Sequence, residues 1–172
     1  MDINFNIYKK FSKKFNMRLS YFNISLNNDV GKVTGDAHGI IQSNIAVAEF
    51  LISFNRKHAL RIVAQGLFVN KVEEETEPGF FEMVPNDKGN WASLLLEYTI
   101  SPHWFLSVMD LYNYGNQHSS KRVHYAYVSA GYIRGSTRIT VGYGRQREGL
   151  FCVGGVCRYV PASNGLTLSF TQ

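Results

Sequence analysis

Two cysteines carry the most defined chemistry in this chain of 172 residues, which contains no others. Cys152 and Cys157 flank the pair Gly154-Gly155, and consecutive glycines favour a tight turn. A structural zinc site requires four ligands, and this stretch supplies neither a histidine nor a third cysteine. We therefore predict a disulfide that closes the tip of a loop in an oxidising compartment, with a free thiol pair as the alternative.

Six charged residues lie in segments that alternate between apolar and polar types: Arg18, Glu49, Arg61, Glu97, Asp110 and Arg138. Successive residues of a strand project to opposite faces, so we expect these side chains on the polar face of a sheet. In a membrane barrel that face lines the interior. There the charges either pair with one another and fill the interior, or line a pore that selects by charge. Both interpretations stay open.

Catalytic and metal-binding arrangements are poorly represented in the chain. A serine hydrolase needs a histidine and a serine on one face, whereas His124 and Ser129 fall on opposite faces of a regular strand. A phase change near Tyr127 predicts a β-bulge, which would alter that geometry. The acidic run at residues 73–77 lacks the ligand spacing of a calcium loop. We predict no enzyme, no cofactor and no metal site.

The elements that must position these residues are strands, because a two-residue alternation recurs along the chain up to the end of Leu166-Thr167-Leu168-Ser169-Phe170-Thr171-Gln172. Nine segments carry it, at about residues 2–9, 14–26, 43–54, 59–71, 91–100, 103–114, 122–134, 136–147 and 158–171. Between them, short connections alternate with long ones at about residues 27–42, 72–90, 115–121 and 148–157. Segments of about ten residues joined in this way are typical of transmembrane β-barrels.

The fold predicted from this pattern is all-β: an up-and-down antiparallel transmembrane β-barrel that occupies residues 1–172 as a single domain. No apolar run approaches the ~18 residues of a membrane helix. An odd strand count predicts that the chain is the C-terminal part of a larger barrel, truncated on its N-terminal side, since bacterial barrels usually have even counts. A strand miscounted around residues 26–44, for example at Gly39-Ile40-Ile41, is the alternative.

The net charge of +5 raises the question of nucleic-acid binding. The positive residues, however, cluster at two apparent turns, at residues 9–14 and at residues 56–57. No basic stripe interleaves with aromatic residues as a nucleic-acid groove requires. We therefore expect no nucleic-acid partner.

Several stretches resemble a known family of proteins. They include Asn90-Trp91-Ala92, Tyr112-Asn113-Tyr114-Gly115-Asn116, Gly144-Arg145-Gln146-Arg147-Glu148-Gly149 and Cys152-Val153-Gly154-Gly155-Val156-Cys157-Arg158, of which the last two are the most specific. Over about residues 40–172 the chain resembles the C-terminal half of an uncharacterised outer-membrane β-barrel family of the Bacteroidetes type, a domain of unknown function. The resemblance implies an envelope location and longer chains, and no established activity or catalytic residues.

The function expected from the sequence is that of a channel or transport-type barrel in a bacterial outer membrane. Its partners would be the lipid bilayer, the barrel-assembly machinery and a small solute. One alternative is a surface-binding or structural barrel whose interior is plugged. Another is a soluble carrier of the lipocalin type, which has an apolar interior and a polar exterior. The face that carries Arg138, Gly142 and Gly144 distinguishes them, since it faces the interior of a membrane barrel and the solvent in a carrier.

Overall fold

The computed structural model describes residues 2–27, 40–70, 89–116 and 119–172. Nine strands form one antiparallel sheet in the order β1-β2-β3-β4-β5-β6-β7-β8-β11, and β9 pairs with β10 in a separate hairpin. The sheet strands are β1 (Ile3–Lys10), β2 (Phe15–Asn27), β3 (Ile40–Ser53), β4 (His58–Asn70), β5 (Trp91–Ile100), β6 (Trp104–Tyr112), β7 (His124–Arg134), β8 (Thr137–Gln146) and β11 (Ser163–Thr171). The hairpin strands are β9 (Gly149–Val153) and β10 (Val156–Val160), and a 3-10 turn covers Ser119–Lys121.

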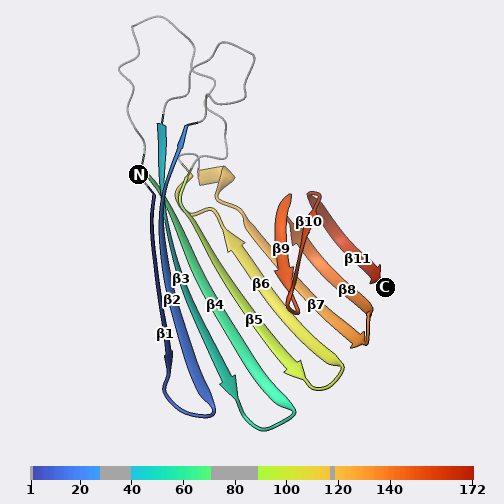
Figure 1. Ribbon diagram of the computed structural model, residues 1–172. Helices are drawn as coiled ribbons and strands as arrows, with labels where there is room; N and C mark the ends of the chain where they lie inside the picture. The colour runs from blue at the N-terminus through green and yellow to red at the C-terminus, as the bar shows by residue number, and fades with distance from the viewer. Residues whose placement is uncertain (1, 28–39, 71–88, 117–118) are drawn as a thin grey trace, which may run out of the picture.

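The two ends of the sheet differ in the length of their connections (Figure 1). At the short-turn end, strands are joined by residues 11–14, 54–57, 101–103 and 135–136. At the long-connection end, consecutive sheet strands are separated in the sequence by residues 28–39, 71–90, 113–123 and 147–162. The acidic run at residues 73–77 lies outside the described residues. The alternation of short and long connections agrees with the pattern predicted from the sequence.

The predicted all-β, up-and-down antiparallel sheet of nine strands is confirmed, and it is not closed into a barrel. Its edges are β1 and β11, which pair with no further strand in the described part of the chain. Figure 1 shows the strands as a curved, open sheet with the β9–β10 hairpin lying in front of β7 and β8. Across residues 2–27, 40–70, 89–116 and 119–172, no helix is long and apolar enough to cross a membrane.

One of the predicted strands is wrong. The ninth segment, at 158–171, is in fact two strands, because β10 ends at Val160 and β11 begins at Ser163. The chain leaves the sheet after β8 and forms the β9–β10 hairpin. It then returns to the sheet as β11, which pairs with β8. The β6–β7 register runs without interruption from His124 to Tyr132, and the β7–β8 register ends at Tyr127, opposite Gly144 with its φ of 137°.

The register defines two faces of the sheet, because directly opposed residues of antiparallel strands project to the same side. We call the side that the hairpin covers the hairpin face. It carries Glu97, Ser107, Ser129 and Thr140, all buried. We call the other side the apolar face. Its exposed large side chains include Phe5, Leu19, Phe68, Leu94, Leu106, Val108, Val128, Val141, Leu166, Leu168 and Phe170.

Candidate functional site

The hairpin that covers the sheet is closed by a two-glycine turn and a disulfide. Gly154 and Gly155 have φ of 61° and 77°, the pair of positive values that a type I′ turn requires. The turn sets Cys152 directly opposite Cys157, and their sulfur atoms are bonded at 2.02 Å. The predicted disulfide is confirmed. The predicted open loop at residues 148–157 is instead mostly part of a two-stranded hairpin.

Apolar contacts hold the hairpin against the sheet. Phe151, Val153 and Val160 are buried in one cluster with three residues of the hairpin face, Leu95, Phe105 and Tyr127. The rings of Phe151 and Tyr127 meet edge to face with centroids 5.3 Å apart. Cys152 and Cys157 alternate with these residues along the hairpin strands, so the disulfide lies on the side turned away from the sheet.

Small residues of the sheet make room for the large aromatic rings. A Cβ at Gly131 would collide with the Phe105 ring, and a Cβ at Gly142 would collide with Tyr127. With no side chain at Gly142, the Tyr127 hydroxyl reaches across β8 to the hydroxyl of Thr167 on β11. Glycines at these two positions therefore allow the Phe105 and Tyr127 rings to lie flat against the neighbouring strand.

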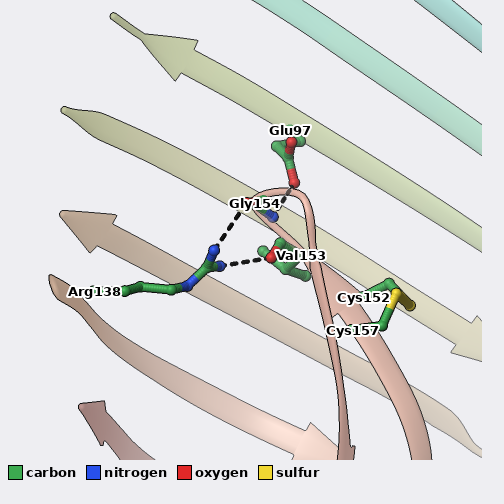
Figure 2. The surroundings of a disulfide bond; sticks show 6 residues. All are labelled: Glu97, Arg138, Cys152, Val153, Gly154 and Cys157. Atoms are coloured by element: carbon green, nitrogen blue, oxygen red, sulfur yellow. Dashed lines mark hydrogen bonds between the residues drawn. A yellow bond between two sulfur atoms is a disulfide. The ribbon is translucent and has the colours of Figure 1, made fainter. Parts of the chain in front are cut away.

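Two residues of opposite charge hold the tip of the hairpin by its backbone (Figure 2). Glu97 on β5 accepts a hydrogen bond from the Gly154 N–H at 2.5 Å. Arg138 on β8 donates to the Val153 carbonyl at 2.6 Å and to the Gly154 carbonyl at 2.8 Å. The Arg138 guanidinium also lies over the Phe105 ring, 4.8 Å from its centroid. These contacts satisfy backbone groups that would otherwise be buried without partners.

A second group of predicted residues forms ion pairs on β2, β3 and β4. Glu49 accepts from Arg61 Nε at 2.6 Å and lies 3.7 Å from Arg18. The register places all three on the hairpin face. Their side chains are partly exposed, so the pairs contribute little to stability. Of the two interpretations of these charges, the distances favour the one in which they pair with one another.

Asp110 does not lie with the other five predicted residues. It is opposed by Leu94 and Ala126, which places it on the apolar face near the long-connection end. There Asp110 Oδ2 lies 2.7 Å from Nδ1 of His124, and the His124 ring stacks on Tyr112 with centroids 4.0 Å apart. The sequence was misleading here because both sides of this segment are mostly apolar, so a single acidic residue could not define its phase.

The residues considered for hydrolase chemistry also lie apart. His124 projects to the apolar face, whereas Ser129 is buried on the hairpin face, where its hydroxyl bonds Ser107 at 2.6 Å. In the described part of the chain, no group of three or more His, Cys, Asp or Glu residues is placed to hold a metal ion.

Sequence reasoning missed the hairpin as a cover for the sheet. The signal was present in Phe105 and Tyr127, two large aromatic residues that share a face with the polar residues Ser107 and Ser129 of the same strands. Tyr127 suggested a bulge because the alternation breaks there. The structure gives another reason, since an apolar residue can occupy a polar face where another apolar element packs on it.

Fold and site together define a class of protein: an open antiparallel β-sheet with one exposed apolar face and one face partly covered by a disulfide-closed hairpin. The chain belongs to the family of unknown function DUF6029, which matches residues 1–172. No curated protein and no solved structure matches the chain. The family description assigns no activity.

Proposed function

We propose that this chain forms part of the wall of a transmembrane β-barrel in a bacterial outer membrane, with the apolar face against lipid. We further propose that the β9–β10 hairpin fills part of the interior, so that the barrel has a structural or surface-binding role. Its partners would be the bilayer, the barrel-assembly machinery and a ligand at the long connections.

The observation that carries the proposal is the exposed apolar face. On β11, Leu166, Leu168 and Phe170 are 76%, 74% and 63% exposed, while the residues between them are small and polar. A soluble antiparallel sheet usually packs its apolar face on the core and leaves the polar face in water. Here the β9–β10 hairpin packs on the other face, over Leu95, Phe105 and Tyr127, while the large side chains of the apolar face stay exposed. Lipid is the surrounding that accepts such an apolar face.

The distribution of side chains along the apolar face supports the same orientation. Aromatic pairs lie towards the short-turn end. The ring centroids of Phe15 and Phe50 are 6.2 Å apart, and those of Trp104 and Tyr132 are 4.8 Å apart. From Phe15 to Tyr21 the strand covers roughly 20 Å at ~3.3 Å per residue. That length is comparable with the ~25 Å apolar band of outer-membrane barrels, which aromatic girdles border.

The two alternative functions are less well supported by these contacts. A lipocalin-type carrier keeps its apolar residues inside, whereas the face that carries Arg138 is covered and the apolar side chains are exposed. An open channel needs a continuous water path, whereas the hairpin lies on the polar face and Glu49 pairs with arginines there. We therefore favour a structural or surface-binding role for a barrel whose interior is plugged.

Reconstitution of the full-length protein into lipid vesicles tests the proposal. We expect the protein to resist carbonate extraction and to migrate faster on gels when it is not heated, as closed membrane barrels do. We also expect the vesicles to retain small neutral sugars as well as empty vesicles do. Solute flux above that of empty vesicles would contradict the plugged interior and favour a channel. Recovery in the soluble fraction without a heat-dependent shift would contradict the membrane proposal itself.

A further inference from the structure

An open hollow of about 500 Å³ lies at the long-connection end of the sheet. It is bordered by Tyr125 near the start of β7, by residues 145–148 at the end of β8, and by residues 162–164 at the start of β11. Its volume falls within the ~300–1,000 Å³ of small-molecule sites. No residue named so far in the hairpin contacts borders it, so the hollow is separate from the hairpin site.

Two arginines at the hollow are supported by aromatic rings. The guanidinium of Arg145 lies 4.8 Å from the centroid of Tyr125, and that of Arg147 lies 4.4 Å from the centroid of Trp91. Trp91 and Tyr125 pack on each other with centroids 6.1 Å apart, and Trp91 is buried. A guanidinium stacked on a ring is held in place, so Arg145 can present its N–H edge to a planar, two-oxygen partner.

Polar groups suited to hydroxyls surround the same hollow. Glu148, Asn164 and Ser163 border it, and the Ser163 hydroxyl donates to Gln146 Oε1 at 3.2 Å. Gln146 is 5% exposed, and its Nε2 has no hydrogen-bond partner among the described residues. A buried donor without a partner is costly, so an acceptor that reaches it on binding would gain stability.

We propose that this hollow binds an acidic saccharide unit. Its carboxylate would be recognised by Arg145 with the support of Arg147, since arginine and carboxylate form two parallel hydrogen bonds. The sugar hydroxyls would bond to Glu148, Gln146 and Asn164. The aromatic rings beneath the arginines fix the donors before the ligand arrives, which reduces the entropy lost on binding. This inference does not depend on the membrane proposal.

Titration of the full-length protein with glucuronate tests the inference. The chain has two tryptophans, so a Trp104→Phe background leaves Trp91, beneath Arg147, as the fluorescent reporter. We expect saturable binding of glucuronate, weakened at least tenfold by Arg145→Gln. Arg56→Gln, in the exposed turn at the opposite end of the sheet, is the matched control and should bind as the parent does. The far-UV circular dichroism spectrum of each variant shows whether its β-sheet folds.

Two further probes separate the parts of the proposed ligand. Glucose, which has the hydroxyls without the carboxylate, should bind at least tenfold more weakly than glucuronate. Inorganic phosphate should compete only weakly. Equal binding of glucose would overturn the assignment of the arginines, and equal binding of phosphate would overturn the saccharide class. Absence of saturable glucuronate binding, or unchanged binding in a folded Arg145→Gln variant, would overturn the site.

Discussion

At the scale of single residues, Gly154 is the most constrained position of the hairpin. Its φ of 61° is one that residues with a Cβ adopt at a cost. A Cβ there would also lie 2.9 Å from the Phe105 ring and 2.5 Å from an Arg138 nitrogen. Gly135 has the same φ of 61°, and a Cβ there would meet nothing within 4 Å. A comparison of substitutions at the two glycines therefore distinguishes the cost of backbone strain from the cost of crowding under the hairpin.

We expect Gly135→Ala to cost about 1–2 kcal/mol of folding free energy, the ordinary penalty for a left-handed residue. Gly154→Ala should cost a further ~1–3 kcal/mol, because the added methyl forces Phe105 or Arg138 out of place. Denaturant titration of the two variants side by side measures both. Equal losses for the two would show that the hairpin tip is not packed on the sheet.

The charges of Glu97 and Arg138 act on the same hairpin tip from opposite sides. Arg138→Gln removes the charged donors to two carbonyls, and charge-assisted hydrogen bonds contribute about 1.5–3 kcal/mol each. We expect faster amide hydrogen exchange at residues 149–160 in this variant, with β5 and β6 unchanged. Glu97→Gln combined with Arg138→Gln should cost less than the sum of the single changes, because the residues share a partner. Arg134→Gln, at the exposed end of β7, is the control and should leave the exchange of the hairpin unchanged.

At the scale of elements, the hairpin has three separate sources of stability: the two-glycine turn, the disulfide and the packing of Phe151 and Val153 on the sheet. The disulfide closes a loop with a sequence separation of 5 and lies on the side turned away from the sheet. Its loss therefore removes no contact between the hairpin and the sheet. β8 pairs with β11 independently of the hairpin.

We expect the double variant Cys152→Ser with Cys157→Ser to keep the nine-stranded sheet and to loosen the hairpin. Closure of so short a loop contributes about 2 kcal/mol in the chain-entropy model. Amide exchange of residues 149–160 should therefore become faster by a factor of roughly 30. Loss of protection along β5 and β8 as well would contradict the independence of the sheet from the hairpin.

The elements that could be predicted from the sequence are those whose contacts follow from a local pattern of residue types. The sheet strands could be predicted from the alternation of residue types, because successive residues of a strand face two different surroundings. Asp110 could not be placed, since the strand around it is apolar on both sides. The β9–β10 hairpin could not be placed on the sheet either, because its contacts join Phe151 to Tyr127 and Leu95 across the chain. The disulfide needed only local information, and it was predicted.

At the scale of the whole molecule, the two faces of the sheet make opposite demands on their surroundings. Phe5 and Asn6 are neighbours on edge strand β1, both are exposed, and they project to opposite faces. In water an arginine at either position would change stability little, because exposed surface substitutions are usually within ~0.5 kcal/mol. In the proposed orientation Phe5 faces lipid and Asn6 does not, so an arginine would have different effects on stability at the two positions.

We expect Phe5→Arg to destabilise the protein in lipid vesicles by about 2–4 kcal/mol if the side chain lies near the bilayer midplane. Asn6→Arg should stay within ~1 kcal/mol of the parent. Urea titration of the vesicle-inserted proteins, monitored by tryptophan fluorescence, compares them. Equal stabilities of the two variants would mean that the apolar face does not contact lipid.

The excursion between β8 and β11 has a consequence for protein engineering. The chain leaves the sheet at Gln146 and re-enters it at Ser163, and these two residues are directly opposed in the register. The whole intervening segment is thus an insertion whose ends already lie side by side. A tight turn could join these two residues without a change in the β8–β11 pairing, and a foreign peptide grafted there would be presented from the ends of two strands that already pair.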